Sequence, residues 1–93
     1  MLYNEKNVKL LFFSPYVKIK KKSDEIIFYN YIFETVTLIK CNKNIEKLFQ
    51  SIKRGIEMQD LLEEVNEYFE ENATEIVNKL IVNGVIEWTE YII

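Results

Sequence analysis

The sequence of 93 residues contains no histidine, and this absence excludes several kinds of site. Histidine is the commonest general base, the usual base of a catalytic triad and the commonest metal ligand. The single cysteine, Cys41, can form neither an internal disulfide nor, by itself, a zinc or iron–sulfur site. Nothing in the sequence supplies a base to activate Cys41, so we interpret it as a structural thiol. The sequence therefore predicts no enzyme activity, no cofactor and no metal site.

Glycine, proline and long apolar runs are also scarce. The two glycines, Gly55 and Gly84, are too few for a glycine-rich phosphate loop. The start of the chain is not a good signal peptide, because charges at Glu5, Lys6 and Lys9 crowd it and its apolar run, Leu10 to Phe13, is only four residues long. No run approaches the roughly 20 apolar residues of a membrane helix. The single cysteine fits a reducing compartment, so the chain is expected to be cytoplasmic. The short apolar runs predict no membrane partner.

The charge is divided unevenly between the two halves of the chain. Residues 1–55 hold eleven Lys or Arg against five Asp or Glu, whereas residues 56–93 hold one Lys against ten acids. The totals of 12 and 15 return the net charge of −3. Two interpretations remain open: a solvated surface of uneven charge, or a basic face in the first half that attracts a partner.

Bulky and β-branched residues dominate the first forty positions and predict strands. We expect strands at 8–13, 17–21, 25–30 and 33–41. In 17–21, Val17 and Ile19 alternate with lysines, which is typical of a half-buried strand with one basic face. Segment 33–41 (FETVTLIKC) is rich in β-branched residues, which favour extended backbone.

The period of the apolar residues changes after Cys41 and predicts three helices. The first has Asn42 or Asn44 as its cap and Gly55 after its end, and the third is capped by Asn72. Residues 85–93 read as a final strand or wing. The apolar stripes are Ile45, Leu48, Phe49 and Ile52; Leu61, Leu62, Val65, Tyr68 and Phe69; and Ile76, Val77, Leu80 and Ile81.

The predicted fold is therefore α+β. It is a three-stranded antiparallel sheet followed by a three-helix winged-helix unit, with possible extra strands at the two ends. Residues 1–93 form a single domain, in which 1–15 are an N-terminal extension or an extra strand.

Four segments resemble the PqqD-like peptide-binding domains, also called RiPP recognition elements. They are PYVKIKKKSDEIIFYN, FETVTLIKC, KRGIEMQDLLEEV and ATEIVNKLIVNGVIE, and the resemblance runs from Tyr16 to about Glu87. It implies binding of the leader region of a ribosomally synthesised precursor peptide, in the biosynthesis of natural products such as bacteriocins. The partners it implies are that leader and a modifying enzyme, such as a radical or cyclising maturase. It gives no oligomeric state, so an oligomer is possible.

The resemblance also implies where the peptide binds. In the family, the leader adds as a strand beside the third strand of the sheet and lies against the third helix. Segment 1–15 departs from the family and could cover that strand edge. A Thr37→Pro substitution is expected to remove a backbone donor from the edge. The implied peptide-binding residues are Thr35, Val36, Thr37, Leu38 and Ile39 on the strand, and Asn78, Lys79 and Val82 on the helix.

Two alternatives remain. A winged helix first suggests a DNA-binding regulator, and Lys18, Lys20, Lys21 and Lys22 could contact phosphates. The acidic helical half would repel DNA, so nucleic acid is the less favoured partner. Alternatively, the chain is a structural subunit of a larger complex, in which terminal aromatic residues form an interface. These residues are Phe12, Phe13, Trp88 and Tyr91.

Overall fold

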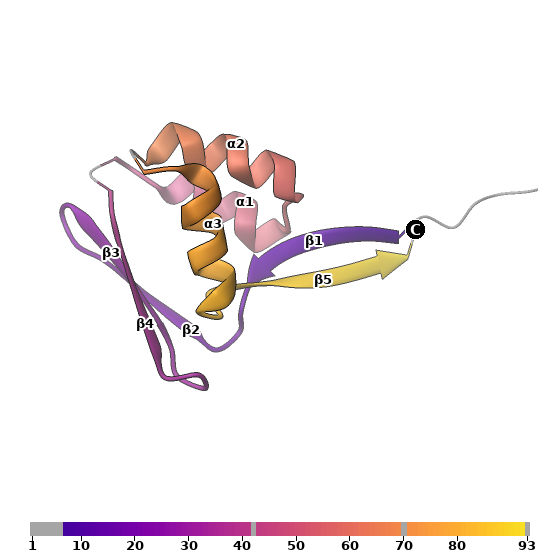
Figure 1. Cartoon of the computed structure of the whole chain (residues 1–93), viewed down its shortest axis with the longest axis horizontal. Coiled ribbons are helices and arrows are strands. Elements are labelled where there is room, and N and C mark those ends of the chain that lie inside the picture. Colours follow the sequence, from indigo (N-terminus) through magenta and orange to yellow (C-terminus); the bar gives the residue numbers. More distant parts are fainter. Residues whose placement is uncertain (1–6, 42, 70, 93) are drawn as a thin grey trace, which may run out of the picture.

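The computed structural model describes residues 7–41, 43–69 and 71–92 and has an α+β fold. Three helices follow three strands, and one further strand lies at each end, as the sequence predicts (Figure 1). The elements are β1 (Asn7–Phe13), β2 (Val17–Lys21), β3 (Glu25–Asn30), β4 (Thr35–Lys40), α1 (Glu46–Arg54), α2 (Met58–Tyr68), α3 (Ala73–Val82) and β5 (Ile86–Ile92).

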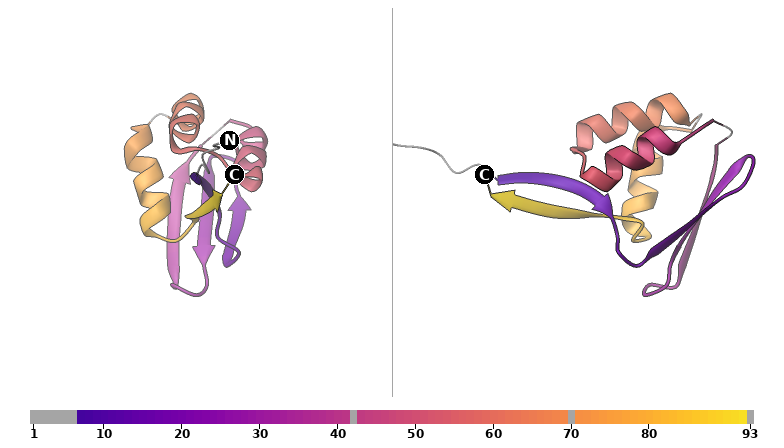
Figure 2. Two further views of the ribbon diagram at one scale, coloured as in Figure 1. Left: turned by 90° about the vertical axis from the view of Figure 1, so that its right-hand side faces the viewer. Right: turned by 180° about the vertical axis from the view of Figure 1, so that it is seen from behind.

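Strands β2, β3 and β4 form an antiparallel sheet in which β3 is central. The helices cover one face of this sheet, with α1 on the side of β2 and α3 on the side of β4 (Figure 2). Successive side chains of a strand point to opposite faces, so Ile26, Phe28 and Ile39 enter the core while Val36 and Leu38 stay exposed on the outer face. The apolar core therefore lies between the inner face and the helices.

The two terminal strands form a separate sheet. β1 pairs with β5 along its whole length, from Asn7 opposite Ile92 to Phe13 opposite Ile86, and the ribbon projects from the body (Figure 1). At its base, the Leu11 N–H donates to the Ile56 carbonyl at 2.8 Å, and the Ile56 N–H donates to the Leu11 carbonyl at 3.0 Å. The N-terminal strand therefore pairs with β5 and does not cover an edge of the three-stranded sheet.

Local signals explain most helix boundaries. The Asn72 side chain caps α3 as predicted, by accepting from the Glu75 N–H. At α1 the N-cap residue is Ile45, which forms no side-chain cap bond, and Asn44 lies one residue before it, with its side chain accepting from the Glu46 N–H. Asn42, the alternative cap, lies outside the described residues. None of the helices in the described part of the chain is long and apolar enough to cross a bilayer.

The third strand of the meander begins later than predicted. The Asn30 side-chain oxygen accepts from the N–H groups of Ile32 and Phe33, each at 2.9 Å, and this closes a turn over residues 31–34. Glu34 takes a left-handed conformation with φ of 57°. Phe33 and Glu34 therefore belong to the turn, and β4 starts at Thr35. The β-branched composition could not reveal this, because the turn is set by an asparagine outside the predicted strand.

Candidate functional site

The predicted peptide-binding residues lie on β4 and α3. Within the described residues, β4 pairs with β3 alone, so its other side is an open edge of the sheet. Open edges present backbone N–H and C=O groups that can pair with another chain. α3 lies beyond this edge on the inner face of the sheet (Figure 2).

Three hydrogen bonds fix which β4 residues face the open edge. The Cys41 N–H donates to the Asp24 carbonyl at 2.9 Å, while the Lys22 N–H donates to Glu25 and the Tyr31 N–H to Tyr16. Hydrogen-bonded pairs alternate along an antiparallel ladder, so even-numbered residues of β3 bond β4 and odd-numbered ones bond β2. The residues of β4 that direct their backbone groups away from β3 are therefore Val36, Leu38 and Lys40.

This hydrogen-bond pattern corrects the expectation that Thr37 supplies a backbone donor to the open edge. Its partner is Phe28, an even-numbered residue of β3, so the Thr37 N–H points into the sheet. A proline at position 37 would break the ladder with β3 and would leave the edge donors in place. Leu38 is the position at which proline removes an edge donor.

The side chains of β4 divide between the two faces of the sheet. Val36 and Leu38 are 58% and 50% exposed on the outer face, whereas Thr37 and Ile39 are 2% and 1% exposed on the inner face. Thr35 is half-buried. Val36 and Leu38 thus combine an edge-directed backbone with an exposed apolar side chain, while Thr37 and Ile39 serve packing.

Side-chain hydrogen bonds hold β4 against the end of α3. The Thr35 hydroxyl donates to the Asn83 carbonyl at 2.6 Å, and the Asn83 side-chain amide donates to the Thr37 hydroxyl at 2.8 Å. Lys79 precedes Asn83 by four residues and therefore shares its side of the helix. Thr35 and Thr37 are therefore bonded to the end of α3, and Lys79 lies on the same side of that helix as Asn83.

Asn78 and Val82 are placed differently from Lys79. Asn78 precedes Asn83 by five residues, which is about 140° around the helix, so the two lie on different sides. Both Asn78 and Val82 are exposed, and Val82 is exposed by 69%. The structure does not bring Asn78 to the β4 side.

Asn30, Asn83 and Gly84 are important here and were not among the predicted site residues. The buried Asn30 amide donates to the Gly84 carbonyl at 2.7 Å and so ties the β3–β4 turn to the end of α3. Gly84 has φ of 73°, and a Cβ there would lie 2.5 Å from the Phe33 ring. A glycine after the apolar stripe of the third helix is typical of a helix end, but the contacts of Asn83 and Gly84 with β3 and β4 connect residues 46 to 54 positions apart.

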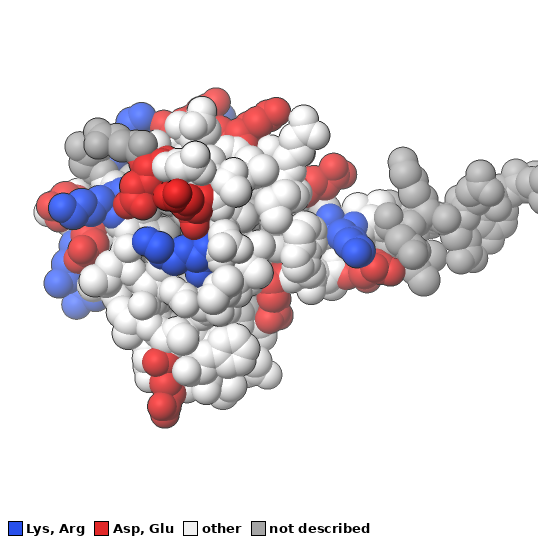
Figure 3. All heavy atoms as spheres, viewed as in Figure 1, with Lys and Arg blue, Asp and Glu red and all other residues white. Residues whose placement is uncertain are grey.

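The surface charge differs between the sheet edge and the helices. The lower part of the body in Figure 3, around the end of α3 and the start of β4, carries few charged side chains. On the outer face, Lys18 and Lys20 of β2 are exposed, and the Lys18 ammonium lies 5.6 Å from the centre of the Tyr31 ring. Lysines therefore concentrate at the β2 edge, and apolar side chains at the β4 edge.

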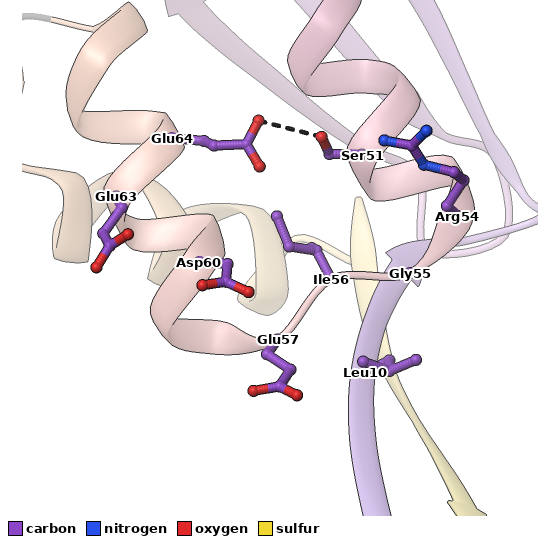
Figure 4. Close-up of a pocket in the computed structure, with 9 residues that line it drawn as sticks. All are labelled: Leu10, Ser51, Arg54, Gly55, Ile56, Glu57, Asp60, Glu63 and Glu64. Atoms are coloured by element: carbon purple, nitrogen blue, oxygen red, sulfur yellow. Dashed lines mark hydrogen bonds between the residues drawn. The ribbon is translucent and has the colours of Figure 1, made fainter.

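A pocket lies between β1, α1 and the start of α2, away from the β4 edge (Figure 4). Four of its nine lining residues are acidic, and the Ser51 hydroxyl donates to the Glu64 carboxylate at 3.1 Å. No group of three or more His, Cys, Asp or Glu side chains among the described residues could hold a metal ion. Its lining residues are Leu10, Ser51, Arg54, Gly55, Ile56, Glu57, Asp60, Glu63 and Glu64.

The terminal aromatic residues are not equally accessible. Phe12 and Phe13 are half-buried, and the Phe13 ring packs edge-on against Phe49. Trp88, on the projecting ribbon, is 45% exposed. The Tyr91 side chain lies outside the part described. Among these terminal aromatic residues, Trp88 is the one described side chain with a large exposed ring.

Overall similarity to known proteins adds no information about this site. Comparison of the chain with protein-family models, curated proteins and solved structures found no match.

Proposed function

We propose that this chain binds an extended peptide by strand addition at β4 and presents it to a modifying enzyme. The observation that supports this most directly is the open edge at Val36, Leu38 and Lys40, which lies beside α3 and carries exposed apolar side chains. The family resemblance suggests that the peptide is the leader of a ribosomally synthesised precursor. The chain itself is then a non-catalytic carrier in natural-product biosynthesis.

The energetics of such an addition favour β4. Each net backbone hydrogen bond contributes about 0.5–1.5 kcal/mol, which is close to the roughly 1–2 kcal/mol lost when a peptide residue is ordered. Backbone pairing alone is therefore nearly neutral. Burial of Val36 and Leu38, each exposed by half or more, supplies the remaining free energy.

We also infer a winged-helix relationship for the helical part. The short bridge from Ile56 to Leu11 gives the α1–α2 connection the role of a strand, and β5 follows α3 as a wing would. α3 carries Glu75 and Lys79, and α2 carries four acidic residues and no basic one. This charge argues for a peptide in place of DNA.

The proposal is tested by titrating the full chain with the leader of a short peptide encoded beside it. We expect binding heat in calorimetry and shifts of the Val36, Leu38 and Lys40 amide signals in nuclear magnetic resonance. Leu38→Pro should abolish most of the affinity, because it removes an edge donor. The control is Lys21→Pro, an edge proline on β2 that also removes the bond from the Lys21 ammonium to the Cys41 carbonyl, and it should leave leader affinity unchanged. Absence of heat with both the leader and the intact precursor would refute the proposal.

A DNA-binding role is the second candidate, since β2 exposes Lys18 and Lys20 side by side on the outer face of the sheet. It predicts duplex binding at low salt that weakens when Lys20, Lys21 and Lys22 are changed to Glu. If a labelled duplex shows no mobility shift at low salt, this candidate is wrong.

A further inference from the structure

On the outer face of the sheet, the edge strand β4 carries two apolar side chains and one basic side chain. Across the strands, Val36 lies opposite Tyr29, Leu38 opposite Ile27 and Lys40 opposite Glu25. Val36, Leu38 and Lys40 are all exposed. Along β4, two exposed apolar side chains and one exposed basic side chain therefore occupy alternate positions. The backbone groups of the same three residues point toward the open edge.

Resting on the proposed strand addition, we propose that the bound segment carries the pattern acidic–x–apolar–x–apolar, read from its N-terminus. Residues directly opposite each other on neighbouring strands share a face, with Cβ atoms about 4.5–5.5 Å apart. Residues of an added strand that lie opposite Lys40, Leu38 and Val36 must therefore be two positions apart and on the outer face. Apolar side chains there cover Leu38 and Val36, and a carboxylate complements Lys40.

The direction of the pattern follows from the direction of pairing. Antiparallel pairing is somewhat more stable per residue than parallel pairing. In an antiparallel addition, the residue opposite Lys40 comes first in the peptide, and the residue opposite Val36 comes last. Parallel addition would require the reverse order, so the order of the pattern reports the orientation.

We expect the outer face of β4 to determine which peptide sequence binds, because the hydroxyl groups of Thr35 and Thr37 are already hydrogen-bonded to Asn83. The Thr37 hydroxyl already accepts from the Asn83 amide, and the Thr35 hydroxyl already donates to the Asn83 carbonyl. The carboxylate preference is the weaker part of the pattern, because Glu25 already lies opposite Lys40 on β3. The two apolar positions should dominate.

Three labelled nine-residue peptides with blocked ends and identical composition test this pattern on the full chain. The first carries the pattern, the second carries it in reverse order, and the third places the two apolar residues side by side. By fluorescence anisotropy, the first should bind about three- to tenfold more tightly than the third. Amide shifts at Val36 and Leu38 should accompany its binding.

The outcomes separate this inference from the proposed function. Equal affinity of all three peptides, with shifts confined to β4, would overturn the pattern and leave strand addition standing. Tighter binding of the reversed peptide would overturn the antiparallel order. If none of the three binds while the natural leader does, the pattern is wrong. If the leader also fails, the proposed function falls with it.

A charge reversal tests the acidic position separately. Lys40→Glu should weaken the first peptide about two- to fivefold, and should strengthen by a similar factor a version with Lys in place of the acid. Lys20→Glu is the matched control, on the same face but two strands and roughly 10 Å away. Equal effects of the two reversals would show general attraction and overturn the pairing with Lys40.

Discussion

The two edges of the three-stranded sheet show how one small sheet can offer one side for pairing and protect the other. β2 carries lysine at three of its five positions, whereas β4 carries one lysine in six and exposes Val36 and Leu38. Lysine on an edge strand discourages pairing with another chain, because pairing would desolvate its charge. The edge beside α3 lacks this protection, so it is the one suited to a partner strand.

The largest expected effect comes from breaking the connection that positions the β4 edge. Asn30→Ala removes the bonds to Gly84, Ile32 and Phe33, and leaves the buried Gly84 carbonyl without this donor. It should lower the free energy of unfolding by about 2–3 kcal/mol. Urea denaturation measures this, and Ser23→Ala, in the exposed turn between β2 and β3, is the control with a change below about 0.5 kcal/mol. Similar losses in both variants would contradict the role given to Asn30.

Making the β4 edge resemble the β2 edge should abolish peptide binding. Val36→Lys with Leu38→Lys places charges on two exposed positions, so stability should change by less than about 1 kcal/mol. Leader affinity, measured by calorimetry, should fall about tenfold or more. Unchanged affinity would mean that the peptide binds elsewhere.

Making the β2 edge resemble the β4 edge should promote self-association. Lys18→Val with Lys20→Val gives β2 an apolar outer face like that of β4. Because the protecting lysines are gone, self-association should rise measurably in size-exclusion chromatography with light scattering. The wild-type chain at the same concentration is the control. No change in mass across a tenfold concentration range would show that these lysines do not protect the edge.

The smallest effect expected is that of salt on peptide binding. A peptide held by backbone bonds, apolar contacts and one exposed charge pair should lose less than about threefold in affinity between roughly 50 and 200 mM salt. A nucleic-acid ligand that contacts several phosphates would lose about a thousandfold over the same range. A steep loss with the leader would therefore contradict the edge-pairing geometry.

Most helices and strands could be predicted from the amino-acid sequence, because their signals are local. Alternation of Val17 and Ile19 with lysines marked β2 with its observed bounds, and Asn72 with Glu75 marked the start of α3. Apolar periodicity also separated most buried positions from exposed ones, as it did for Ile76, Val77 and Leu80. These features depend on residues a few positions apart, which a single sequence displays.

Which strands pair, and which backbone groups stay at an open edge, depends on contacts between segments far apart in the sequence. Nothing local shows that β1 pairs with β5, that Asn83 bonds Thr37, or that Asn78 lies on a different side of α3 from Asn83. Local signals also do not show that the backbone N–H of Leu38, and not that of Thr37, faces the open edge. Hydrogen bonds between β3 and β4 fix this alternation. Pairing depends on contacts between distant segments, and shifting a strand by one residue would exchange its two faces without changing its composition.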